Sequence, residues 1–84
     1  MSAALADLFL AVGDLESIPA AFRSDGALLS AADFATTVRT RVDAYADCLI
    51  KAFAVKNSLT AEEYSLFRYC ERKGDALCAS FDMF

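Results

Sequence analysis

The stretch that decides the fold is SAADFATTVRTRVDAYADCLIKAFAVK, residues 30–56. Its apolar residues recur at intervals of three and four, which is the period of one face of an α-helix. These residues are Phe34, Val38, Val42, Tyr45, Leu49 and Phe53. The opposite face carries the charged residues Arg39, Asp43, Asp47 and Lys51. We therefore predict one long amphipathic helix over residues 30–56.

Two further segments have the same period. Residues 3–16 place Leu5, Leu8, Phe9, Val12 and Leu15 on one side. Residues 60–82 do the same with Leu66, Phe67, Cys70, Gly74, Leu77, Cys78 and Phe81. Helix starts are signalled by a capping-box variant at Ser30 and Asp33 and by a standard capping box at Thr60 and Glu63.

These helices predict an all-α fold, with residues 1–84 forming a single domain. The second and third helices are separated only by a short connection at Asn57 and Ser58, so we expect them to form an antiparallel hairpin. Their apolar sides should meet, and the first helix should pack across the pair. A chain of 84 residues can only just build a sufficient core, and a hydrophobic content of 57% helps it to do so.

Composition and charge exclude several classes of protein. A net charge of −4, from 8 basic and 12 acidic residues, argues against a nucleic-acid-binding protein, which needs clustered Lys and Arg. No apolar run approaches the roughly 20 residues of a membrane span. The N-terminus has no basic residue before its apolar part and contains Asp7, unlike a signal peptide. We favour a soluble intracellular protein.

The stretch FRSDGALLSAADF, residues 22–34, resembles part of a calcium loop but does not fit one. With Gly26 at loop position 6, positions 1, 3, 5 and 12 are Ala21, Arg23, Asp25 and Ala32. Only Asp25 among these offers a ligand, so calcium binding is excluded. Residues 24–26 instead predict a turn ahead of the helix start.

The three cysteines allow two interpretations. All of them can be small core residues in a reducing compartment, which is a common fate for cysteine. Alternatively, Cys48 and Cys70 lie nearly equidistant from the turn near Ser58, which would make them neighbours across the hairpin and candidates for a disulfide. Cys78 would then face Val38 and stay free.

A hairpin with such a disulfide would be loosely similar to the twin-cysteine hairpin proteins of the mitochondrial intermembrane space. The resemblance covers only residues 48–78, and it would imply that compartment if Cys48 and Cys70 were oxidised. The sequence departs from that family because the paired C-x9-C signature is absent and Cys70 and Cys78 form C-x7-C. We therefore assign no family.

Catalysis and metal binding find little support. The chain has no His, so a Ser or Cys nucleophile would lack an imidazole base, and it has no glycine-rich phosphate loop. Its three cysteines contain no C-x-x-C pair, the spacing typical of a structural zinc site. We expect no cofactor and no enzymatic activity.

Several residues are candidates for an interface. Leu10, Ile50 and Tyr64 fall outside the predicted apolar stripes. Arg41 lies within a stripe, where it can reach water along its own stem, pair with Asp75, or meet an acid of a partner chain. At the C-terminus, Phe81 and Phe84 either close the bundle or belong to a recognition tail, SFDMF.

The sequence alone does not name an activity. These features favour a non-enzymatic structural or protein-interaction protein, either a small accessory subunit or a homodimeric adaptor. The alternative is a helical binding module that holds an apolar ligand or a lipid between its helices.

Overall fold

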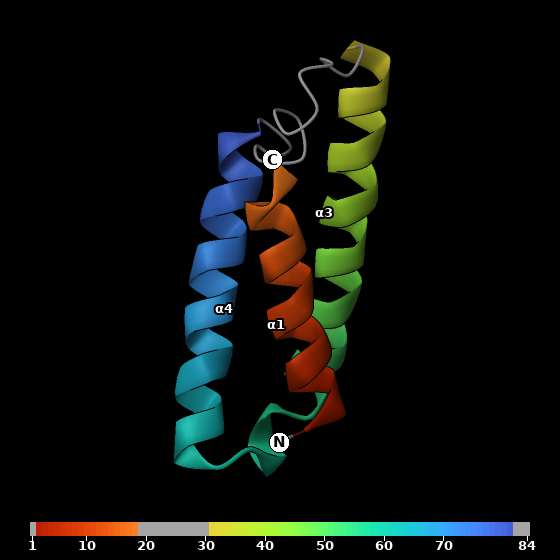
Figure 1. Ribbon diagram of the computed structural model, residues 1–84. Helices are drawn as coiled ribbons and strands as arrows, with labels where there is room; N and C mark the ends of the chain where they lie inside the picture. Colours follow the sequence, from red (N-terminus) through yellow and green to blue (C-terminus); the bar gives the residue numbers. More distant parts are fainter. Residues whose placement is uncertain (1, 19–30, 82–84) are drawn as a thin grey trace.

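The computed structural model describes residues 2–18 and 31–81. Helix α1 spans Ala3–Glu16, α3 spans Ala31–Ala54 and α4 spans Ala61–Ser80, and a 3-10 turn, η1, covers Lys56–Ser58 (Figure 1). The described residues thus confirm the predicted all-α fold with three helices. The predicted turn at residues 24–26, the capping box at Ser30 and the terminal Phe84 lie outside them.

The helix ends follow from local hydrogen bonds. After Ala54 the chain tightens, since the amide of Val55 donates to the carbonyl of Ala52 at 3.2 Å and that of Ser58 to Val55 at 2.9 Å. This three-residue spacing belongs to a 3-10 turn, and it ends α3 two residues before the predicted position. The Thr60 capping box is confirmed, because the amide of Glu63 donates to Thr60 Oγ1 and the amide of Thr60 to Glu63 Oε1, both at 3.1 Å.

Helices α3 and α4 run antiparallel, and α1 lies along the seam between them (Figure 1). Helix α1 packs more extensively against each of the two than they pack against each other. Its buried residues form one continuous stripe, which consists of Leu5, Leu8, Ala11, Val12 and Leu15. The predicted hairpin is therefore present, with the first helix packed across it, and the apolar sides of α3 and α4 meet in one core that they share with α1. The apolar side chains of α1 fill much of the seam, so α3 and α4 contact each other less than each contacts α1.

One place brings α3 and α4 into close contact. Tyr45 of α3 is 1% exposed, and its ring lies directly against the backbone of Gly74 in α4. A Cβ atom at position 74 would lie 2.6 Å from the Tyr45 hydroxyl oxygen and closer still to two ring carbons. Only glycine allows the ring to approach the helix backbone this closely.

Candidate functional site

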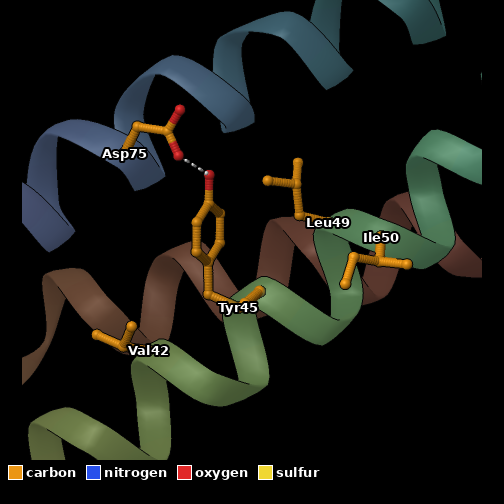
Figure 2. Close-up of a pocket in the computed structure, with 6 residues that line it drawn as sticks. Val42, Tyr45, Leu49, Ile50 and Asp75 are labelled. Atoms are coloured by element: carbon orange, nitrogen blue, oxygen red, sulfur yellow. Dashed lines mark hydrogen bonds between the residues drawn. The ribbon is translucent and has the colours of Figure 1, made fainter. Parts of the chain in front are cut away.

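An open groove runs between α3 and α4, and no residue of α1 lines it (Figure 2). Its volume is about 440 Å³, and its surface is mostly apolar. The lining residues are Val42, Tyr45, Ala46, Leu49 and Ile50 from α3 and Asp75 from α4. The groove is therefore a second seam of the same hairpin, which α1 does not cover.

The α3 wall of the groove has helical spacing. Val42, Ala46, Leu49 and Ile50 follow one another at steps of four, three and one, which keeps them on one side of the helix. Ile50 is 68% exposed, and Phe53, one turn after Leu49, is 53% exposed. Large apolar side chains that remain in water at such spacing are typical of a surface that another helix covers.

The polar end of the groove is built from Tyr45 and Asp75. The Tyr45 hydroxyl donates to Asp75 Oδ1 at 2.9 Å, and it also lies 3.0 Å from the carbonyl oxygen of Glu71 (Figure 2). Burial raises the pKa of Tyr45 well above its ordinary value, and the hydrogen bond and charge of Asp75 raise it further. The hydroxyl therefore stays protonated and acts as a fixed donor to the carboxylate.

Polar contacts hold α1 in place on the opposite side of the hairpin. Arg41 Nη1 donates to the carbonyl oxygen of Asp14 at 2.8 Å and to Ser17 Oγ at 2.9 Å. A cation here satisfies a carbonyl of the last turn of α1 and complements the helix dipole. No Arg41–Asp75 pair forms, so this alternative from the sequence is wrong. The guanidinium points to α1, and Asp75 is bound to Tyr45.

The predicted interface residues do not form one patch. Ile50 lines the groove, whereas Leu10, at 65% exposed, lies on α1, which does not line it. Tyr64 is partly exposed on α4, and its ring centroid lies 6.1 Å from that of the buried Phe67. Phe81 is half-buried and packs against the core, as one of our two interpretations of it expected.

All three cysteines are free thiols in the structure. This agrees with their interpretation as small core residues, and the alternative Cys48–Cys70 disulfide is not formed in it. Cys70 and Cys78 are buried, while Cys48 is half-buried and has Asp7 of α1 among its charged neighbours. The seam that a disulfide would cross is the one that α1 fills.

The thiols are not activated for chemistry. Burial raises the pKa of Cys48, Cys70 and Cys78, and nearby acids raise it further for Cys48 and Cys78. A nucleophilic cysteine needs the opposite shift. Within residues 2–18 and 31–81 there is also no group of three acidic or cysteine side chains placed to hold a metal ion. Among the helices of these residues, none has both the length and the apolarity to cross a membrane.

Sequence reasoning missed the role of Asp75 as the polar end of the groove. It assigned Tyr45 to the apolar stripe and treated Asp75 only as a candidate partner for Arg41. The available signal was Gly74, since a glycine within an apolar helical stripe indicates a close approach by a neighbouring side chain. That signal does not say which side chain approaches.

Comparison of the chain with protein-family models, with curated proteins and with solved structures finds no match.

Proposed function

We propose that this chain is a non-enzymatic protein-interaction protein whose groove between α3 and α4 receives a helix of another protein chain. The observation that carries this proposal is the groove itself, an apolar surface of about 440 Å³ that α1 leaves uncovered. Such a surface supports a role as an accessory subunit or adaptor, because contiguous exposed apolar area is typical of protein interaction sites.

The other side of the hairpin supports a helix as the occupant. There, α1 lies between α3 and α4 and buries Leu5, Leu8 and Leu15 completely. The groove offers a second seam between the same two helices, with apolar residues at helical spacing on its α3 wall. An amphipathic helix that lays its apolar face into such a groove is a recurring mode of protein recognition.

An apolar small molecule or lipid is the second candidate. The volume of about 440 Å³ lies within the range of ligand sites, and Tyr45 and Asp75 could orient a polar group of the ligand. However, a ligand pocket buries most of its ligand, and this groove is open along α3. A helix can cover the length of that opening, whereas a small molecule would leave much of itself in water.

Site-specific photo-crosslinking tests the proposal. A photoreactive phenylalanine analogue is placed at Ile50 in one sample and at Leu10 in a second, because these two residues have similar exposure, 68% and 65%, on different surfaces. We expect a discrete protein adduct from position 50 in cells that make the protein naturally, and little from position 10. Mass spectrometry of the adduct then distinguishes a second copy from another protein.

Three outcomes would contradict the proposal. An adduct only from position 10 would move the interaction to α1. Lipid or small-molecule adducts at position 50 would favour the second candidate. The absence of adducts at both positions would mean that the groove is not a docking surface in the cell.

A further inference from the structure

The Asp75 carboxylate is exposed at the groove, and its charge is not balanced within the described structure. Three acids of the described residues are paired with bases: Asp47 with Lys51, Glu71 with Arg68, and Glu16 with Lys73. Among residues 2–18 and 31–81, Asp75 has no Lys or Arg partner, and Tyr45 is its hydrogen-bond donor. Asp75, the acid that lines the groove, can therefore pair with a cation of another molecule.

The carboxylate is also held in a defined position. The ring of Tyr45 is packed against Gly74, so the hydroxyl that donates to Asp75 Oδ1 has little freedom to move. The second carboxylate oxygen points away from the Tyr45 hydroxyl, and because Asp75 is exposed this oxygen can accept from a further donor (Figure 2). An anion fixed next to an apolar surface is a suitable anchor for one cation of a docking helix.

A helix that covered the groove would remove water from Asp75. A carboxylate that loses water without gaining a cation destabilises a complex, because its desolvation is not compensated. Such a helix would therefore need Lys or Arg beside its apolar stripe, and Arg suits the task because it is weakly hydrated and can donate two parallel hydrogen bonds.

The charge of the whole chain points the same way. A net charge of −4 attracts a basic partner and opposes a second copy, which would bring four more negative charges. A groove with one acid at its polar end thus favours a basic helix of another protein over a helix of a second copy of this chain. From these observations we propose that the occupant of the groove is a basic amphipathic helix of a different protein, with a Lys or Arg that pairs with Asp75. This inference rests on the function proposed above.

A selection experiment tests this inference. A displayed library of helices has fixed apolar residues on one face and randomised Lys, Arg, Glu, Gln and Ser on the flanks. The library is selected for binding to the full-length protein. Helices that also bind the Ile50→Glu variant are then removed. We expect the remaining helices to carry Lys or Arg at one edge of the apolar face. We also expect Asp75→Asn to weaken their binding about tenfold, which equals about 1.4 kcal/mol.

Charge reversal provides the matched control. Selection on Asp75→Lys should enrich Glu at the same edge, whereas selection on Asp7→Lys should still enrich Lys or Arg. Both variants change the net charge equally, but Asp7 lies on α1, which does not line the groove. Circular dichroism checks that each variant is folded, which the exposure of both side chains leads us to expect.

The possible failures are distinguishable. If no helix depends on Ile50, the proposed function itself is overturned. If helices depend on Ile50 but show no basic excess and bind Asp75→Asn equally well, the groove stands and this inference fails. If sedimentation shows a dimer of the wild-type protein that Ile50→Glu abolishes, the occupant is a second copy, which also overturns this inference.

Discussion

On one side of the α3–α4 hairpin Leu8 of α1 is fully buried, whereas on the other side Ile50 of α3 is 68% exposed. Both side chains are aliphatic, similar in size and located on helices. The first side is closed by α1 and held by Arg41 at one end of that helix. Within residues 2–18 and 31–81, the second side presents the Tyr45–Asp75 pair and an apolar wall. Helix α3 thus has an apolar surface wider than one neighbouring helix covers, and the exposed remainder is the surface to which we assign the proposed function.

The largest expected difference in unfolding free energy is between the variants Leu8→Ala and Ile50→Ala. Loss of a fully buried leucine should lower the free energy of unfolding by about 2–5 kcal/mol, because it leaves a cavity. Loss of an exposed isoleucine should change it by less than about 0.5 kcal/mol. Urea denaturation of both variants measures the difference. A large loss from Ile50→Ala would mean that the groove is closed in solution by self-association or by a rearranged core.

The next effect concerns Gly74, where the two sides of the hairpin meet. Gly74→Ala would place a methyl group within the space of the Tyr45 ring, and we expect a loss of about 1–3 kcal/mol from overpacking. This exceeds the gain of up to about 1 kcal/mol that alanine brings to a helix. The matched control is Gly13→Ala in α1, where nothing lies within 4 Å and a gain of about 0.4–1 kcal/mol is expected. Equal effects of the two substitutions would contradict the close packing of Tyr45.

The closed side of the molecule was easier to predict from the sequence than the open one. Helical periodicity identified the buried Leu5, Leu8, Val12 and Leu15, because burial in a bundle requires apolar residues at steps of three and four, but it also placed Phe9 in the stripe, and Phe9 is 52% exposed. The same rule could not tell that α1, and not α4, lies against much of the apolar surface of α3. The spacing of side chains fixes which face is apolar, whereas the neighbour of that face depends on how three helices share their contacts.

Exposed residues show the same limit. Ile50 was identified because it falls outside the centre of the apolar stripe, but Phe53 was placed within that stripe and is half exposed. Periodicity cannot separate a covered apolar stripe from an uncovered one. The Tyr45–Asp75 contact joins residues 30 positions apart in the chain, so no local pattern could indicate it.

Tyr45→Phe tests the polar end of the open side. The ring and its packing against Gly74 are kept, while the hydrogen bond to Asp75 is lost, so we expect a loss of about 0.5–1.5 kcal/mol at neutral pH. Burial raises the pKa of Tyr45 in the folded state most, and Asp75 raises it further. The unfolded chain releases this proton above about pH 10 while the folded chain keeps it, so the wild-type protein loses stability as pH rises further.

The phenylalanine variant lacks this titration. The difference in unfolding free energy between the wild type and Tyr45→Phe should therefore narrow between about pH 9 and about pH 11. Urea denaturation at several pH values measures it, and the buried thiols, which titrate in both proteins, cancel in the comparison. Parallel profiles over this range would mean that Tyr45 reaches water and that the end of the groove is not fixed.

The smallest expected effect concerns Glu63, at the edge of the closed side. Its carboxylate accepts hydrogen bonds from the amides of Thr60 and Ser2, both at 3.1 Å, and so connects the start of α4 to the start of α1. The hydrogen bond from the Thr60 amide lowers the pKa of Glu63 most, and the hydrogen bond from the Ser2 amide lowers it further. Glu63→Gln should slightly lower the free energy of unfolding at neutral pH, since an amide oxygen is a weaker acceptor than a carboxylate.

Glu62→Gln is the matched control for this substitution. Both residues lie in the first turn of α4, so each variant removes a charge that favours the helix dipole, but only Glu63 is bonded to Ser2. A carboxyl group with a lowered pKa stabilises the folded state above its unfolded-state pKa of about 4.3, and this stabilisation is lost as pH falls through its folded-state pKa. The loss of unfolding free energy caused by Glu63→Gln should therefore shrink in acid. Urea denaturation at neutral pH and at about pH 3 measures both variants. If they lose the same stability and follow the same pH profile, the contact with Ser2 adds nothing, and apolar packing and the contacts of Arg41 and Lys73 alone keep α1 on the closed side.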